Sequence, residues 1–96
     1  MTYIINGKEY KEKRFDFAAL VKLEECGVSM NDFASVSRPL TLIVGLVAWV
    51  MDCDKEKATQ EINEHLEKGG SLDDCLKILE SIKDSDFFQK AMQKKN

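Results

Sequence analysis

The sequence predicts an α+β fold that is mostly helical and forms a single compact domain over residues 1–96. An N-terminal β-hairpin over residues 1–14 should be followed, over residues 15–96, by four to five short helices. Three observations predict this fold. A chain of 96 residues is long enough for one domain with a modest core. An Asn-Gly pair near its start is a strong signal for a tight hairpin turn. Most of the remaining chain combines helix-capping residues with apolar residues at helical spacing.

The hairpin is expected around Asn6 and Gly7, because both residues readily adopt the positive φ angles of a type I′ turn. Residues 3–5 before the turn are β-prone, and residues 8–14 after it are mostly charged around one tyrosine. A two-stranded hairpin is only marginally stable alone, so it should lie against a helix or pair with another strand. Its free edge either binds a partner strand or is protected by its lysines.

The first helix is expected to begin at Asp16, a favourable N-cap residue, and to run to Cys26. Gly27 then stands where many helices end on a left-handed residue. Ser29 is expected to cap a short turn over residues 31–33. The inner side of the helix should carry Phe15, Ala19, Leu20 and Leu23.

Residues 39–51 form the longest apolar run, and we expect a second helix there. Ser37 can cap this helix, and Pro39 is tolerated in its first turn, where a missing N–H costs nothing. β-branched residues would also permit a buried strand, but the length of the run and its capped start favour a helix. The run is shorter than the roughly twenty residues of a bilayer crossing, so no membrane partner is expected. A helix that is apolar on all sides lies at the centre of a core or is covered by a partner.

A third helix is expected over residues 55–68, with Asp54 as its N-cap and a Gly-Gly pair after its end. Its apolar stripe is thin, since most of this segment is charged or polar. The stripe consists of Ala58, Ile62 and Leu66. Such a helix should lie at the surface and pack along one edge.

Ser71 and Asp74 resemble a capping box, although aspartate is shorter than the usual glutamate. They should open a fourth helix that ends before residues 84–86. Its apolar face consists of Leu72, Cys75, Leu76, Leu79 and Ile82. Residues 87–92 are then expected to form a last short helix.

The sequence predicts no catalytic, cofactor-binding or metal-binding residues. His65 is the only histidine, and no nucleophile elbow or triad pattern accompanies it. We expect its side chain to be solvated or partly packed. Cys53, His65 and Cys75 lack the closely spaced pairs that zinc sites use. With Cys26, these cysteines are expected to be free thiols in a reducing cytoplasm.

The charge balance argues against nucleic acid as a partner. A net charge of -3 gives no general attraction to nucleic acid or to anionic membranes. No predicted helix carries a basic face that would follow a phosphate backbone. The sequence therefore predicts a protein that binds another protein and does not catalyse a reaction.

Two apolar groups of residues are candidates for partner binding. The first group lies on the second predicted helix and consists of Leu42, Leu46 and Trp49, which share one side of it. The second group lies on the last predicted helix and consists of Phe87, Phe88 and Met92. These residues either fill the core or form a patch that receives a partner helix or a second copy of the chain.

Residues 15–28 read FDFAALVKLEECGV, which has the form F-x-F-x-x-L-x-x-L-E-E-x-G. The segment INGKEY at residues 5–10 precedes it, and the apolar residues 40–49 follow it. In these segments the sequence resembles tail assembly chaperones of long-tailed bacteriophages and prophages of Gram-positive hosts. In that family a similar hairpin leads to this helix, then to an apolar helix and an acidic helix pair. The resemblance covers roughly the whole chain in order and length.

The resemblance implies a non-enzymatic function. A member of this family would bind the long helical tape measure protein, keep it soluble and help recruit tail tube subunits around it. It would act in the cytoplasm of the bacterial host and be absent from the mature virion. Spare apolar surface on the chain also makes a homo-oligomer an expectation. Two other classes stay open: a small phage or plasmid-borne regulatory protein that binds a host protein, and a minor enzyme that uses His65 with a cysteine.

Overall fold

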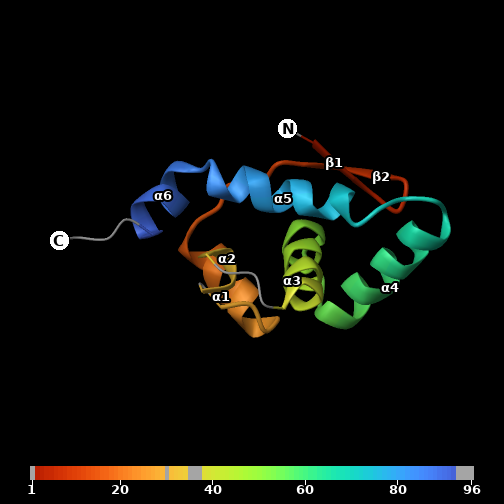
Figure 1. Ribbon diagram of the computed structural model, residues 1–96, viewed down its shortest axis with the longest axis horizontal. Helices are drawn as coiled ribbons and strands as arrows, with labels where there is room; N and C mark the ends of the chain where they lie inside the picture. The colour runs from red at the N-terminus through yellow and green to blue at the C-terminus, as the bar shows by residue number, and fades with distance from the viewer. Residues whose placement is uncertain (1, 30, 35–37, 93–96) are drawn as a thin grey trace.

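The computed structural model describes residues 2–29, 31–34 and 38–92 of the chain. Its elements, labelled in Figure 1, are β1 (Thr2–Ile5), β2 (Lys8–Lys11), α1 (Phe17–Glu25), α2 (Asn31–Ala34), α3 (Pro39–Met51), α4 (Lys55–Glu67), α5 (Asp73–Lys83) and α6 (Asp86–Met92). The predicted α+β, mostly helical fold with an N-terminal hairpin is confirmed. The described residues form six helices rather than four to five, because α2 is helical where a turn was expected.

The hairpin has the predicted turn. Asn6 and Gly7 have φ angles of 53° and 76°, and β1 pairs with β2 so that Tyr3 lies opposite Tyr10. Tyr3 and Ile5 are buried on one side of β1. The hairpin lies along α5 and also contacts α4 (Figure 1). Two helices thus supply the cover that an isolated hairpin needs.

Helix α3 lies at the centre of the fold (Figure 1) and contacts α1, α4 and α5. Gly45 in its middle has a steric reason, because a Cβ atom there would lie 2.5 Å from a methyl carbon of Val28. Glycine therefore lets the segment after α1 approach α3 closely.

None of the helices in the described ranges combines the length and the hydropathy that a membrane crossing requires.

Side-chain caps begin α1 and α4 as predicted. The carboxylate of Asp16 accepts a hydrogen bond from the N–H of Ala19 at 3.1 Å. Asp54 accepts one from the N–H of Lys57 at 2.8 Å. Each cap satisfies an N–H group that has no partner inside its helix. The cap predicted for α3, Ser37, lies outside the described residues.

Asp32 in α2 joins the end of α1 to the start of α3. Its carboxylate accepts a hydrogen bond from the N–H of Ser29 at 2.9 Å and pairs with Arg38 at 3.1 Å. Arg38 also donates to the carbonyl oxygen of Gly27 at 2.9 Å. The N–H of Ser29 and the guanidinium of Arg38 hold the pKa of Asp32 below its usual range.

The predicted stripe of α4 is correct for Ala58 and Ile62, which are buried, and wrong for Leu66, which is 41% exposed. Glu61 and His65 are buried instead. The reason is that the hairpin turn and the start of α5 pack on this side of α4 and bind these two polar side chains.

Candidate functional site

The first predicted patch lies in the core. Leu42 and Leu46 are fully buried, and Trp49 at the end of α3 is nearly so. The surrounding helices α1, α4 and α5 cover α3, so Leu42 and Leu46 present no surface to a partner. The structure agrees with the core interpretation of these two residues and does not support a binding role for them.

The second predicted patch lies on α6. Phe87 and Phe88 are half-buried there, and their ring centroids lie 5.9 Å and 6.2 Å from that of Phe15. The ring of Phe88 also lies 5.4 Å from that of Phe33 in α2. Met92 belongs to α6, but its side chain lies outside the described part of the structure.

Phe15 joins the two predicted patches. Its ring lies 5.7 Å from Trp49 and 6.2 Å from Phe33, in addition to its contacts with α6. All of these pairs meet edge to face, a favoured geometry worth about 0.5–1.5 kcal/mol per pair beyond burial. We call Phe15, Phe33, Trp49, Phe87 and Phe88 the aromatic cluster. The sequence predicted partner binding for Trp49, Phe87 and Phe88. It placed Phe15 on the inner side of the first helix and Phe33 in a short turn, with no role in binding.

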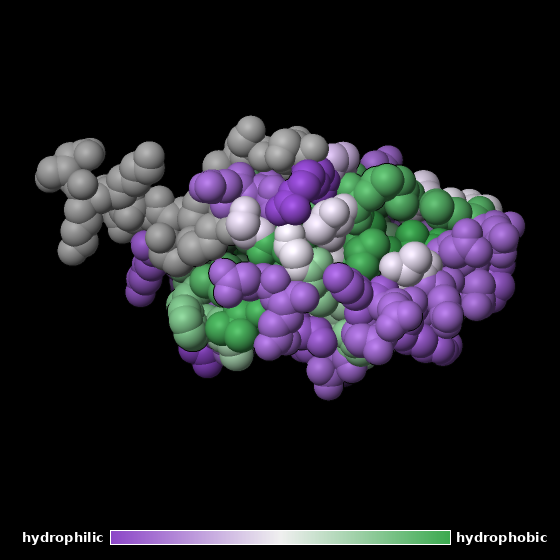
Figure 2. Space-filling model, turned by 90° about the horizontal axis from the view of Figure 1, so that it is seen from below, coloured by the Kyte–Doolittle hydropathy of each residue, from purple (hydrophilic) through white to green (hydrophobic). Residues whose placement is uncertain are grey.

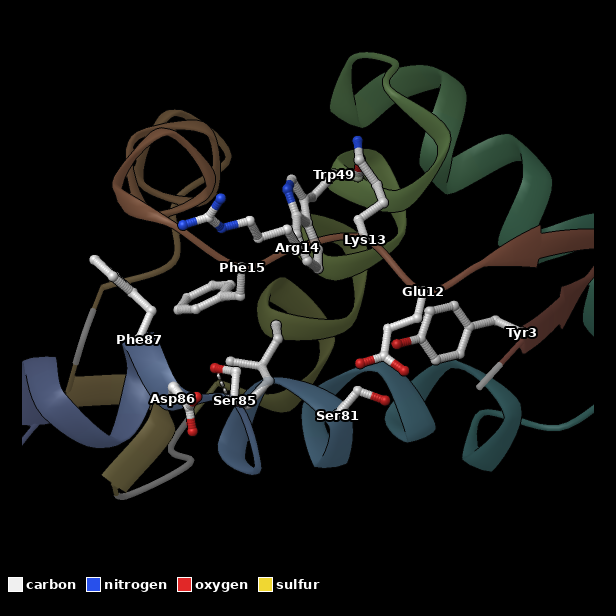
Figure 3. Close-up of a pocket in the computed structure, with 11 residues that line it drawn as sticks. Tyr3, Glu12, Lys13, Arg14, Phe15, Trp49, Ser81, Ser85, Asp86 and Phe87 are labelled. Atoms are coloured by element: carbon white, nitrogen blue, oxygen red, sulfur yellow. Dashed lines mark hydrogen bonds between the residues drawn. The ribbon is translucent and has the colours of Figure 1, made fainter.

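A pocket of about 290 Å³ opens beside the aromatic cluster, between residues 12–15 and the junction of α5 and α6 (Figure 3). It is lined by Tyr3, Glu12, Lys13, Arg14, Phe15, Trp49, Ser81, Ile82, Ser85, Asp86 and Phe87. The ammonium of Lys13 donates to the carbonyl oxygen of Trp49 at 2.7 Å and lies 5.5 Å from its ring centroid, a cation–π arrangement. Pockets for small molecules start at about this volume.

A second, more apolar pocket lies between α1 and α2. Its volume is about 150 Å³, and it is lined by Phe17, Leu20, Val21, Leu23, Glu24, Val28, Ser29 and Phe33. Phe17 at its rim is 69% exposed, and Val21 one turn later is also exposed. Figure 2 shows hydrophobic surface in more than one area of the molecule, between areas of hydrophilic side chains. We call Phe17, Val21 and this pocket the α1 surface.

A polar cluster, in which Asn6, Glu61 and His65 are buried, ties the hairpin turn to α4 and α5. It consists of Asn6, Glu61, Glu64, His65 and Asp74. The N–H of Asn6 donates to Nδ1 of His65 at 2.9 Å, so Nε2 carries the ring hydrogen and donates to Asp74 at 2.8 Å. The amide of Asn6 donates to Glu61 at 3.0 Å and to Glu64 at 3.1 Å. His65 is therefore fully packed, which the sequence did not predict.

Hydrogen bonds stabilise the charged form of two carboxylates in this cluster. The N–H of Ser71 and the ring of His65 hold the pKa of Asp74 below its usual range. The amide of Asn6 and the ammonium of Lys57 lower the pKa of Glu61 in the same way. Through partners on both ring nitrogens, His65 joins three elements, the hairpin turn, α4 and α5.

The three cysteines are free. Burial raises the pKa of the Cys75 thiol to about 11 and also raises that of Cys53. A thiol that stays protonated near neutral pH is a poor nucleophile and a poor metal ligand. Among the described residues, no group of three or more histidines, cysteines and carboxylates could hold a metal ion.

Comparison of the chain with protein-family models, curated proteins and solved structures found no match. The likeness to tail assembly chaperones therefore stands on the segments that carry it in the sequence. The candidate site stands on its geometry: an aromatic cluster with a pocket on one side and the α1 surface on the other.

Proposed function

We propose that this protein is a non-enzymatic tail assembly chaperone, which binds the tape measure protein and helps recruit tail tube subunits while a phage tail is assembled. It would act in the cytoplasm of the bacterial host and leave the tail before the virion is mature. The resemblance of residues 5–10, 15–28 and 40–49 to such chaperones names the partner. The structural observation that supports it is the exposed α1 surface beside the aromatic cluster.

The α1 surface could bind the apolar face of a partner helix. Phe17 and Val21 expose apolar side chains one helical turn apart, and the pocket beside them continues inward to Leu23 and Phe33. A partner helix laid along α1 would place one apolar side chain in this pocket and rest its neighbours on Phe17. A tape measure helix that repeats such side chains offers this contact many times along its length.

The small size of the surface fits the task of a chaperone. An isolated exposed apolar residue is ordinary, but an aromatic ring that is 69% exposed beside an apolar hollow is costly to leave in water. Covering it with a partner helix recovers part of that cost. An interface confined to one helix and one pocket is small and gives a weak, reversible complex.

A non-enzymatic function is supported by the positions of the groups that could do chemistry. Both ring nitrogens of His65 are bonded within the polar cluster. Burial keeps the thiol of Cys75 protonated. Within the described part of the chain, these groups serve the fold.

The proposal is tested by co-expression with the tape measure protein of the same phage or prophage, which on this proposal would be encoded downstream of this chain's gene. We expect the soluble fraction of that protein to rise several-fold when the wild-type chain is present. Phe17→Ser should abolish most of this gain, because it removes the exposed ring of the α1 surface. The free energy of unfolding of the Phe17→Ser variant should differ from that of the wild type by less than about 0.5 kcal/mol, since Phe17 is exposed.

Ile4→Ser is the matched control. Ile4 is 58% exposed, but it lies on the hairpin and not on the α1 surface. This variant should solubilise the partner as well as the wild type does. If the wild-type chain leaves the downstream protein insoluble, the chaperone proposal fails, and binding to a host protein becomes the better explanation. If both variants lose the effect equally, the α1 surface is not the binding site.

A further inference from the structure

Helix α6 rests on the body of the protein through two aromatic rings. Phe88 contacts both Phe15 and Phe33, and Phe87 contacts Phe15. Ser85 begins α6 as its N-cap, with its hydroxyl oxygen accepting the N–H of Phe88 at 3.2 Å. The same hydroxyl donates to the carbonyl oxygen of Ile82 in α5 at 2.7 Å. α6 is thus a short helix with its own cap, which packs through Phe87 and Phe88 and also contacts α5, where the amide of Gln89 donates to the carbonyl oxygen of Lys83 at 3.5 Å.

The rings beneath α6 connect the two pockets. Phe15 lines the pocket beside the aromatic cluster, and Phe33 lines the pocket of the α1 surface. Phe88 lies against both rings. Both Phe15 and Phe33 are buried in the folded chain. Because Phe87 and Phe88 pack against them, displacement of α6 would expose part of both rings and open a groove between the two pockets.

We propose that α6 covers the central part of the partner-binding groove, and that a partner helix displaces it by placing two adjacent bulky apolar side chains on Phe15 and Phe33. This inference rests on the proposed binding of a helical partner. Helix α6 itself shows what chemistry the groove accepts, because it already fills it with Phe87 and Phe88.

The charges around the groove favour one kind of partner helix. The pocket at the start of α6 is lined by Lys13, Arg14 and Glu12, which together carry one net positive charge, and by Asp86 in the first turn of α6. A displacing helix would therefore gain from an acidic residue just before its apolar pair, as Asp86 precedes Phe87 and Phe88. The partner segment predicted to bind is an amphipathic helix with an acidic residue followed by two bulky apolar residues.

A helix that covers its own binding site lowers the apparent affinity for a partner. The apparent dissociation constant rises in inverse proportion to the fraction of molecules in which the site is open. Variants that weaken the contacts of α6 should therefore bind a helical ligand more tightly than the wild type does. This increase in affinity separates a cover from a structural helix, whose loss only weakens binding.

The test uses the full-length chain and a fluorescently labelled synthetic peptide with the sequence of residues 84–92, followed by fluorescence anisotropy. The double variant Phe87→Ala/Phe88→Ala, which releases α6, should bind the peptide at least tenfold more tightly than the wild type. A control peptide in which both phenylalanines are alanine should not bind either protein. Ser85→Ala, which removes the cap of α6 and the hydrogen bond from the same hydroxyl to Ile82, should give a gain of a few-fold.

Circular dichroism establishes whether each variant is folded. If the double variant is unfolded, the inference is judged on Ser85→Ala alone, by comparing its affinity for the peptide with that of the wild type. The inference is overturned if the opened variants bind the peptide no better than the wild type, or if both peptides bind equally. It is also overturned if the wild type elutes as a dimer and the double variant as a monomer, because the groove then holds α6 of a second copy. None of these outcomes depends on the downstream protein, so they leave the co-expression result to judge the proposed function.

Discussion

The backbone of Gly70 packs directly against the His65 ring of the polar cluster. A Cβ atom at this position would lie 2.4 Å from Nε2 of His65 and nearly as close to two carbon atoms of the ring. The φ angle of Gly70 is not in the left-handed region, so the requirement for glycine is steric and not conformational. The missing side chain is what allows His65 to lie flat against this turn while it donates to Asp74.

Gly70→Ala should therefore lower the free energy of unfolding by about 1–3 kcal/mol, since the ring or the turn must shift to make room. Urea unfolding followed by circular dichroism measures this change. Lys68→Ala, at an exposed position two residues earlier, is the control and should cost less than about 0.5 kcal/mol. If Gly70→Ala is as stable as the wild type, the ring of His65 moves freely and the polar cluster is not closely packed.

Among the elements, the hairpin depends on α4 for its position. The turn residue Asn6 donates through its backbone to His65 and through its amide to Glu61 and Glu64. Its φ angle of 53° lies in the left-handed region, which asparagine and glycine tolerate best. One residue thus sets the shape of the turn and anchors it to a helix.

Two substitutions at Asn6 separate these roles. Asn6→Gly keeps the turn but removes the amide, and it should lower the free energy of unfolding by about 1–3 kcal/mol, because hydrogen bonds to charged groups are lost. Asn6→Ala should cost about 1–2 kcal/mol more, because alanine is strained in the left-handed region. Urea unfolding of both variants gives the comparison. Equal stability of the two would show that the turn relaxes away from its positive φ angle.

The boundaries of the elements were largely predictable because their signals are local. Asp16 and Asp54 bond to N–H groups three residues ahead, and a cap of this kind can be recognised in the sequence alone. The buried side of α4 was not predictable. His65 is buried there, and not Leu66, because the turn at Asn6, 59 residues earlier in the chain, supplies a hydrogen bond. A contact between such distant segments leaves no periodic pattern in either of them.

Across the whole molecule, three carboxylates with lowered pKa values hold different parts of the fold together. Asp32 joins α1 to α3 through Ser29 and Arg38. Glu61 and Asp74 belong to the polar cluster, which joins the hairpin, α4 and α5. Each carboxylate accepts hydrogen bonds that favour its charged form. Acid should therefore weaken both regions together.

In the unfolded chain these carboxyl groups titrate near pH 4. Because their pKa values are lower in the folded state, the stabilisation that they provide is complete above that pH and is lost as the pH falls through the folded-state values. The free energy of unfolding should thus decrease between about pH 5 and about pH 3. Asp74→Asn, which keeps an acceptor oxygen, should make this decrease shallower. Urea unfolding of both proteins at about pH 5 and about pH 3 measures the decrease. If the free energy of unfolding falls as much in the variant as in the wild type, Asp74 does not contribute to the acid sensitivity.

The gathering of aromatic residues is also a property of the whole molecule. All five phenylalanines lie in the aromatic cluster or at the rim of the α1 surface. The sequence identified Trp49, Phe87 and Phe88 as candidates, because each belongs to an apolar helical segment. It did not indicate that Phe15 would bring them together, since α3 and α6 meet at this ring only after the chain has folded.

The separation between the aromatic cluster and the polar cluster has a spectroscopic consequence. The chain contains one tryptophan and one histidine, and Trp49 lies in the first cluster and His65 in the second. Tryptophan emission and the imidazole resonances of histidine are therefore two intrinsic reporters, each specific to one region. A ligand that lifts α6 would change the emission and leave the imidazole signals in place. Detachment of the hairpin would change the imidazole signals, and the emission would follow only if Lys13 also left Trp49.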